Sequence, residues 1–283
     1  MHKAIPYGRQ NITQADIDAV TAALQHDFLT QGPRIEEFEE AFAKYVGAQF
    51  AVAVNNGTTA LHLAYIAAGC GEGDRMITTP ITFAATANAA LYTGAQVTLA
   101  DVDPNTALID LDQVENLLNT HPRGTFKALT PVDLAGLPVD MERCRHLADA
   151  YNLILIEDAC HAPGGSFTDS KGQLHRCGDG SLADFTIFSF HPVKHIACGE
   201  GGMITTNNPE YAQRLRTLRT HGITRENMRE NHGGWYYEMV ELGYNYRITD
   251  IQCALGTSQL KRADEGIEQR RRIAARYDRA FDG

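Results

Sequence analysis

DFTIFSFHPVKHIACGEGGM, residues 184–203, is the stretch from which the fold of this chain is predicted most directly. Residues 186–190 are mostly aromatic or β-branched, a composition typical of a buried strand. Pro192 cannot donate to a ladder, so the strand is expected to end before it. Lys194 would therefore lie just past the end of a buried strand, in a loop that leads to a glycine cluster.

The position of Lys194 suggests a chemical role. A lysine amine must lose its proton before it can attack an aldehyde, and burial or neighbouring cations favour that loss. The cofactor pyridoxal phosphate (PLP) would supply such an aldehyde. Lysines are mostly exposed, however, and a surface lysine beside a glycine-rich turn explains this loop equally well. The rest of the sequence has to decide between the two interpretations.

Length and composition are those of an ordinary globular enzyme. The chain has 283 residues, of which 43% are hydrophobic and 21% charged, enough for one large domain and part of another. The net charge of -10 argues against nucleic acid or an anionic membrane as the main partner. The six cysteines show neither a zinc spacing nor a disulfide framework, as expected in a reducing cytoplasm. We expect no signal peptide and no membrane span, because no apolar run of about 18 residues occurs.

Apolar periodicity predicts strands that alternate with helices. Strands are expected at residues 50–54, 76–79, 96–100, 126–132, 153–157, 186–190 and 203–206. Helices are expected from residue 14 to about 26 and at 35–46, 58–68, 83–91, 111–118, 141–151, 209–219, 248–260 and 264–281. This order is typical of an α/β fold with a mainly parallel central sheet and helices on both faces. Binding sites of such folds collect beyond the carboxyl ends of the strands.

A candidate phosphate site follows the first predicted strand. The sequence there is Asn55-Asn-Gly-Thr-Thr59, directly before a predicted helix. Backbone N–H groups at a helix start point outward and favour an anion. A plain strand-to-helix turn with Thr58 as the N-cap is the alternative, and this segment alone does not exclude it.

A candidate acidic residue, Asp158, lies at the end of the most apolar predicted strand, within Glu157-Asp-Ala-Cys-His161. A carboxylate in such a poorly solvated place needs a cationic partner. A pyridinium N–H is one, and an aspartate paired with it keeps the ring able to accept electrons. Metal binding by Asp158 and His161 is the alternative, but no third ligand stands at a suitable spacing, so we expect no metal.

An aromatic residue, Phe83, stands at the start of another predicted helix, where it could stack on a flat cofactor or simply belong to the core. What favours the cofactor is the order of the features along the chain. A phosphate seat, an aromatic ring, an acid after a buried strand, and then Ser189 and Lys194 after another strand all occur together. A purely structural explanation would have to account for all of them.

Six motifs together resemble the DegT/StrS family of PLP-dependent nucleotide-sugar aminotransferases over nearly the whole chain. They are Asn56-Gly-Thr58, Thr79-Pro80 with Phe83, Glu157-Asp-Ala-Cys-His161, Phe188-Ser-Phe-His-Pro-Val-Lys194, Gly199-Glu-Gly-Gly202 and Gly243-Tyr-Asn-Tyr-Arg247. Within the family, the members that act in pseudaminic acid biosynthesis are most similar at residues 5–10, 30–33, 78–88, 219–222 and 236–239.

The resemblance implies a fold-type-I architecture and a homodimer with a shared active site. It implies that Lys194 bonds to the cofactor aldehyde, that Asp158 holds the pyridine nitrogen and that Phe83 stacks on the ring. His161 would lie beside the cofactor. The remaining implied contacts are Asn56, Gly57, Thr58, Ser189 and the partner subunit's Asn245 on the phosphate, and Tyr7, Asp27, Phe28, Leu29 and Thr30 on the sugar nucleotide.

The resemblance also implies a reaction and a domain organisation. The amino group of L-glutamate would move to C4 of a UDP-linked 4-keto-6-deoxy-N-acetylhexosamine. Residues 1–260 would form the PLP-binding large domain, with an N-terminal arm at 1–32. Residues 261–283 would begin the helix that leads to a small domain. Family members continue for roughly another 100 residues, so we expect that small domain to be absent from this chain.

Three other interpretations remain at the level of sequence. The chain could act on a different nucleotide-linked 4-keto sugar, or it could be a truncated PLP-binding protein that is catalytically weak or silent. It could also be a nicotinamide-dependent sugar-nucleotide epimerase or reductase. That enzyme class needs a glycine-rich turn after the first strand, whereas residues 50–57 contain a single glycine.

Overall fold

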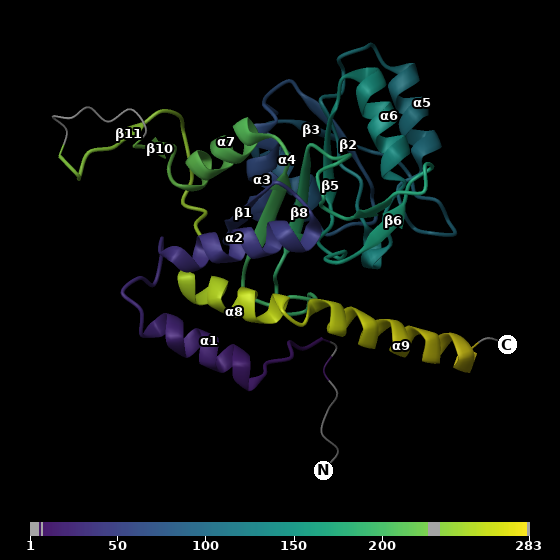
Figure 1. Ribbon diagram of the computed structural model, residues 1–283. Helices are drawn as coiled ribbons and strands as arrows, with labels where there is room; N and C mark the ends of the chain where they lie inside the picture. Colours follow the sequence, from purple (N-terminus) through teal and green to yellow (C-terminus); the bar gives the residue numbers. More distant parts are fainter. Residues whose placement is uncertain (1–5, 7, 226–232, 282–283) are drawn as a thin grey trace.

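A computed structural model describes residue 6 and residues 8–225 and 233–281 (Figure 1). Its centre is a seven-stranded sheet with the order β1-β9-β8-β5-β4-β2-β3. Within this sheet β9 runs antiparallel to β1 and β8, and the other pairings are parallel. The predicted α/β fold with a mainly parallel sheet is confirmed. The strands are β1 (Phe50–Val54), β2 (Arg75–Thr78), β3 (Gln96–Leu99), β4 (Ala128–Leu129), β5 (Ile154–Asp158), β8 (Phe185–Ser189) and β9 (Gly202–Thr206).

Helices cover both faces of the sheet. On one face, α3 (Gly57–Ala67), α4 (Ala85–Tyr92) and α7 (Pro209–Arg219) bury apolar side chains against it. On the other face, α2 (Pro33–Val46) and α8 (Asp250–Leu260) cover one part, and α5 (Leu111–Thr120) and α6 (Met141–Tyr151) cover the rest. Outside α8 lies α1 (Gln14–Leu24), and α9 (Ala263–Phe281) extends from α8 past the body of the sheet (Figure 1). Among the described residues, no helix combines the length and the apolar character that crossing a bilayer requires.

Local signals in the sequence account for most ends of these elements. For example, α2 begins at Pro33, whose missing N–H costs nothing at a helix start, and is capped by Gly47 with φ of 93°. The strand predicted at 126–132 is wrong in length. Only Ala128–Leu129 form β4, because Pro131 has no N–H to continue the ladder. An isolated bridge between Val132 and Asp158 resumes the pairing beyond it.

Two small ribbons were absent from the sequence-based prediction. One joins β6 (Ser166–Thr168) to β7 (Leu174–Arg176), and the other joins β10 (Ile223–Thr224) to β11 (Glu238–Met239). Each strand has two or three residues, too few for an alternating pattern to be recognised. The β10–β11 ribbon projects from the body on the left of Figure 1.

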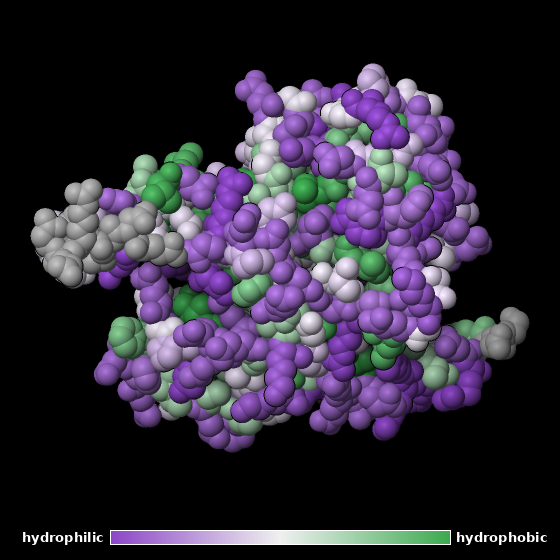
Figure 2. Space-filling model, turned by 45° about the horizontal axis from the view of Figure 1, so that its top comes forward, coloured by the Kyte–Doolittle hydropathy of each residue, from purple (hydrophilic) through white to green (hydrophobic). Residues whose placement is uncertain are grey.

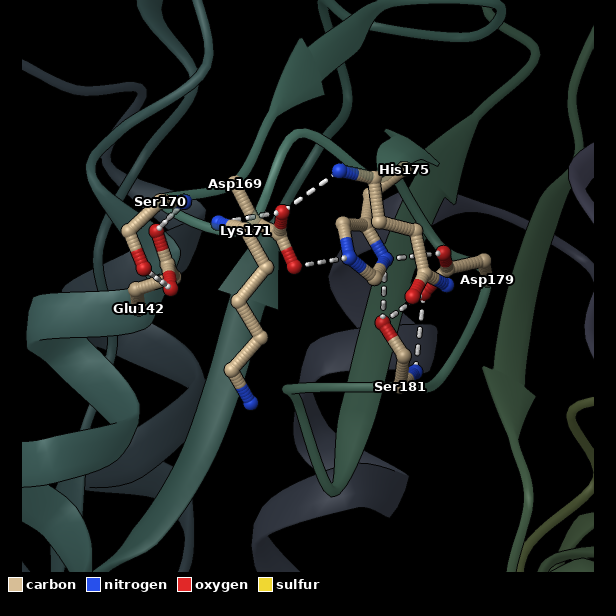
Figure 3. Close-up of polar contacts among 8 residues, drawn as sticks. Glu142, Asp169, Ser170, Lys171, His175, Asp179 and Ser181 are labelled. Carbon is tan, nitrogen blue, oxygen red and sulfur yellow. Dashed lines mark hydrogen bonds and ion pairs between the residues drawn. The ribbon is translucent and has the colours of Figure 1, made fainter.

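The β6–β7 ribbon is held by a buried histidine between two acids. Figure 3 shows His175 with Asp169 on one side of its ring and Asp179 on the other. The distances are 3.3 Å from Nε2 to Asp169 and 3.0 Å from Nδ1 to Asp179. Burial opposes a charge on the imidazole, but the Asp179 and Asp169 carboxylates outweigh it, so the pKa of His175 is raised above its ordinary value. The imidazolium form therefore clamps the ribbon.

This clamp predicts a pH-dependent contribution to stability. A raised pKa in the folded state means that the contribution is complete below the unfolded pKa of about 6.5 and is lost as pH rises through the folded pKa. We expect His175→Gln to lower the free energy of unfolding by about 1–2 kcal/mol near pH 5, and by less as pH increases. Urea unfolding across pH would measure this difference, and a penalty independent of pH would contradict the charged clamp.

Candidate active site

The centre of the candidate site is Asp158, the last residue of β5, at the carboxyl edge of the sheet. Its side chain is 5% exposed. The hydroxyl of Thr86 on α4 donates to Oδ2 at 2.8 Å, and the backbone N–H of Cys160 donates to Oδ1 at 3.2 Å. Both hydrogen bonds fix the orientation of the carboxyl group. A buried acid held in this way is suited to a cationic ring nitrogen.

Lys194 lies in the loop after β8, close enough to interact electrostatically with Asp158 and Cys160. The loop turns back at once, since Lys194 N donates to His191 O at 2.8 Å and Cys198 N donates to Phe190 O at 2.9 Å. Burial lowers the pKa of the Lys194 amine, while Cys160 and Asp158 act in the opposite direction without cancelling it. The amine therefore loses its proton more readily than that of an ordinary exposed lysine, as a nucleophile toward an aldehyde requires.

His161 lies at the same edge and is held neutral. The backbone N–H of Ala135, in the short 3-10 helix η1 (Leu134–Gly136), donates to His161 Nδ1 at 3.2 Å. An Nδ1 that accepts a hydrogen bond carries no proton, so Nε2 must carry it. Burial and the charge of Lys194 both lower the pKa of His161, against the opposing effect of Asp158. The ring can therefore donate one hydrogen bond through Nε2.

The candidate phosphate seat is the start of α3. Asn56, not Thr58, is the N-cap: its side chain accepts from Thr59 N at 2.9 Å, and its carbonyl accepts from Ala60 N. The N–H groups of Gly57 and Thr58, in the first turn of α3, are left for a ligand. Oδ1 of Asn56 accepts the cap hydrogen bond and its backbone N–H donates to Thr59 Oγ1 at 3.3 Å, so the side-chain NH₂ group is the donor with which Asn56 could assist.

The candidate phosphate seat is tightly packed, with no room for a side chain at Gly57 or Gly202. A Cβ on Gly57 would lie 3.0 Å from Ser189 Cβ and 3.6 Å from Cys160 Sγ. The seat, Ser189 and the Asp158 loop therefore meet at one point of the sheet edge. Gly202 backs the seat even more tightly, because a Cβ there would lie 2.4 Å from Asn56 O.

We therefore expect Gly202→Ala to push the Asn56–Gly57 backbone out of place. Overpacking of this kind costs about 1–3 kcal/mol of stability, and affinity for PLP should fall with it. Gly266→Ala is the matched control, since nothing lies within 4 Å of a Cβ at that exposed helical position. Chemical denaturation and cofactor titration would measure both variants. A Gly202→Ala protein with unchanged stability and affinity would contradict this view of the seat.

The other sequence-predicted residues occupy less enclosed positions. Phe83 directly precedes α4 and is 75% exposed. Asn245 is exposed, and its neighbour Tyr246 accepts a hydrogen bond from Asn55 N at 3.0 Å, beside the α3 start. The segment 27–30 is exposed, with Leu29 and Thr30 bonded to the start of α8. Tyr7 lies outside the described residues.

Sequence reasoning missed two residues of the site. Thr86 bonds Asp158 from the next element, and Cys160 lies between Asp158, Lys194 and Gly57. Thr86 could not be recognised from the sequence, because its burial and its bond to Asp158 are visible only in the structure. Cys160 gave no separate signal beyond its place in the motif after Asp158.

The chemistry of these groups fits PLP. The cofactor has a phosphate, a ring nitrogen that takes a proton and an aldehyde, and the site offers helix N–H groups, a buried carboxylate and a lysine amine of lowered pKa. Added side-chain atoms at Gly57 or Gly202 would disturb the phosphate end. The fit thus concerns the phosphate, the ring nitrogen and the aldehyde of the cofactor.

The comparison with known families agrees with this site. Residues 10–283 match the model of the DegT/DnrJ/EryC1/StrS aminotransferase family, and the chain belongs to that family. It is therefore an aminotransferase, which excludes the nicotinamide-dependent alternative.

One named relative and two solved structures show which members of the family this chain is similar to. The chain is 45% identical over 278 residues to the UDP-4-amino-4,6-dideoxy-N-acetyl-beta-L-altrosamine transaminase of Campylobacter jejuni, covering 98% of this chain and 70% of that protein. The structure of Helicobacter pylori PseC, an aminotransferase of pseudaminic acid biosynthesis, superimposes with a TM-score of 0.88 at 33% identity, covering 99% of this chain and 71% of PseC. A sugar aminotransferase from Streptococcus pneumoniae, solved in a PLP form, superimposes with a TM-score of 0.86 at 30% identity, covering 99% and 72%.

Proposed function

We propose that this chain moves the amino group of L-glutamate to C4 of a UDP-linked 4-keto-6-deoxy-N-acetylhexosamine. The product would be UDP-4-amino-4,6-dideoxy-N-acetyl-β-L-altrosamine, for pseudaminic acid biosynthesis. The observation that carries the proposal is the pairing of Lys194 with the buried Asp158 at the sheet edge. The Campylobacter and Helicobacter relatives support the choice of sugar.

PLP is the proposed cofactor, and when bound it supplies an electron sink for the carbon that loses a proton. Asp158 would hold its ring nitrogen, Phe83 would cover a ring face, and His161 would lie beside it. Gly57, Thr58, Ser189 and the Asn56 side chain would hold the phosphate. These assignments rest on the resemblance to the family, and the polar groups at the sheet edge support them.

Lys194 would move the protons of both half-reactions. In the first half-reaction its Nζ would take the proton from the α-carbon of glutamate and deliver it to C4' of the cofactor. In the second it would take a proton from C4' and deliver it to C4 of the sugar. The lowered pKa of Lys194 supports this role, because a larger share of its amine is then in the neutral form that can accept a proton. Burial of the Asp158 and Lys194 region limits competing reactions with water.

Substrate contacts and domain boundaries follow from the same proposal. Tyr7 and the exposed segment 27–30 would contact the sugar nucleotide. Residues 1–260 would form the PLP-binding large domain, with the arm at 1–32, and α9 would begin the connection to a small domain. All six cysteines are free thiols, which supports a reducing, cytoplasmic setting.

A shared active site is the proposed role of the homodimer. The exposed apolar residues of the β10–β11 segment support a partner there, as patches of this kind mark interaction surfaces. Figure 2 shows apolar groups beside this extension. The apolar and aromatic residues of residues 233–242 that are more than half exposed are Trp235, Tyr237, Met239, Val240 and Leu242. The partner subunit's Asn245 would then complete the phosphate seat.

If this is so, cofactor occupancy should depend on dimerisation. Asn245→Ala should weaken PLP binding by about tenfold, the value of one hydrogen bond to a charged group. The exposed Asn105→Ala is the control. Sedimentation at several concentrations, recorded at the cofactor absorbance, would test the dependence. A stable monomer that carries full cofactor would contradict the shared site.

The substrate itself is tested by product analysis. The chain is incubated with PLP, ¹⁵N-labelled glutamate and the UDP-linked 4-keto sugar, and the product is identified by mass and by the configuration at C4. We expect ¹⁵N at C4 of the altrosamine derivative. Amination of another nucleotide-linked 4-keto sugar in its place would favour the alternative substrate, and no transfer to any sugar would favour a PLP-binding protein without this activity.

A further inference from the structure

Two carboxyl groups are buried directly behind Asp158. Glu157 precedes Asp158 on β5 and is 3% exposed, and Asp133, just past β4, is 0% exposed. One oxygen from each acid and the Sγ of Cys177 all lie within 4.8 Å of one another. Among the described residues, neither acid forms an ion pair with a lysine, arginine or histidine. Two buried negative charges at this distance would repel each other strongly.

The hydrogen bonds of the pair leave one oxygen of each acid unsatisfied. Glu157 Oε2 accepts from the Thr186 hydroxyl at 2.7 Å and from Gly178 N at 3.3 Å. Asp133 Oδ1 accepts from Val139 N at 3.0 Å. The remaining atoms, Glu157 Oε1 and Asp133 Oδ2, have no donor within the described part of the chain. Buried polar atoms are rarely left without a hydrogen-bond partner. One proton placed between the two acids would give both oxygens a hydrogen bond.

We propose that Glu157 and Asp133 share a single proton, carried by Glu157 and donated to Asp133, and that this pair holds together the strand ends that carry Asp158. The proton removes one of two buried charges and supplies the missing donor. The pair then bears one negative charge, as two adjacent carboxyl groups in a dry site are expected to do.

The electrostatics of the surrounding groups agree with this assignment. Burial raises the pKa of Glu157, and the Asp133 charge raises it further. Burial also raises the pKa of Asp133, although hydrogen bonds from Val139, Glu157 and the Cys177 thiol oppose the rise. The other titratable groups that face the pair are Asp158 and the thiols of Cys177 and Cys144, and burial raises the pKa of both thiols.

Backbone bonds connect the pair to the site. Asp133 N donates to Asp158 O at 3.0 Å, and Asp158 N donates to Pro131 O at 2.9 Å. The side chains of Asp133 and Glu157 meet behind this junction, so their repulsion after loss of the proton would part the strand ends. Glu157 and Asp133 are therefore positioning residues, whose importance to catalysis rests on the proposed role of Asp158.

The matched variant is Glu157→Gln. Its amide can donate to Asp133 Oδ2 and accept from Thr186, so the shape and the hydrogen bonds are kept while the exchangeable proton is lost. Glu265→Gln, an exposed position on α9, is the control. Infrared spectra at neutral pH should show the carbonyl band of a buried protonated acid in the wild-type chain and in Glu265→Gln, and should lose it in Glu157→Gln.

The second measurement is the pH dependence of unfolding. Because both folded pKa values are raised, the native state binds more protons than the unfolded state, and stability must fall as pH rises above the unfolded values of about 4. Each extra native proton changes the unfolding equilibrium constant tenfold per pH unit. We expect the unfolding equilibrium constants of the wild type and of Glu265→Gln to rise with pH between about pH 5 and the folded pKa of the pair. In Glu157→Gln this rise should be smaller, by up to tenfold per pH unit.

The outcomes separate the proposal from its alternatives. A wild-type spectrum without a protonated-acid band would overturn it even if Glu157→Gln failed to fold. Equal slopes for wild type and Glu157→Gln would also overturn it. Elemental analysis that found one stoichiometric divalent ion, absent from Glu157→Gln, would show a metal in place of the proton. All three measurements work without cofactor, so their outcome is independent of the proposed aminotransferase substrate.

Discussion

Lys194→Ala is expected to abolish aminotransferase turnover, by about 10⁴-fold or more, because it removes both the nucleophile and the proton carrier. Lys194 is the lysine whose burial lowers its amine pKa beside Asp158. Borohydride should fix PLP to Lys194 in the unmodified chain and leave the cofactor removable in the variant. Mass spectrometry of the digested protein would show which peptide carries the label.

The control for this prediction is Lys171→Ala. Lys171 is exposed in the β6–β7 turn, and Figure 3 shows its amine directed away from the neighbouring acids. This variant should keep full activity and full labelling of Lys194. Borohydride labelling of another lysine in the unmodified chain, or substantial turnover by Lys194→Ala, would show that the assignment is wrong.

Asp158→Asn has the second largest expected effect, a loss of about 10²–10⁴-fold in the glutamate half-reaction. The amide keeps the size of the side chain, and the Thr86 hydroxyl and Cys160 N–H can still reach it. What is lost is the negative charge that stabilises a protonated ring nitrogen by a charge-assisted hydrogen bond. Proton removal from glutamate should slow, while the cofactor still bonds to Lys194.

Rapid-mixing absorbance with glutamate would measure that rate. Asp278→Asn, which changes an exposed charge on α9, is the control and should react as the wild type does. Labelling of Lys194 by borohydride should persist in Asp158→Asn. A half-reaction close to the wild-type rate would mean that the ring nitrogen does not depend on this carboxylate.

The fold was predictable because its local signals agree with one another. The run before Pro192 forms β8 and the Pro33 to Gly47 segment forms α2, as the sequence predicts. Asp158 and Lys194 follow from the ends of two apolar runs, and the structure shows that those strands, β5 and β8, are neighbours. The shortening of β4 was the exception. There the apolar pattern of residues 126–132 predicted one long strand, although Pro131 has no N–H and the ladder of β4 ends before it.

The finer parts of the site could not be predicted, because they depend on contacts between distant segments. Thr86 and Asp158 are 72 residues apart, and nothing local to either one shows that they bond. The same is true of Asp133 and Glu157, which approach only because β4 and β5 are neighbours in the sheet. Periodicity identifies buried strands, but it does not identify which buried polar groups meet.

The central claim is that Lys194 and Asp158 form the reactive centre of a PLP-dependent aminotransferase, and one absorbance titration tests it most directly. The purified chain is mixed with PLP, and L-glutamate is then added. We predict a long-wavelength band of lysine-bound cofactor that glutamate removes as the amino group is transferred, and no such band in Lys194→Ala. A wild-type spectrum identical to that of free PLP, or a bound band that glutamate leaves unchanged, would contradict the account.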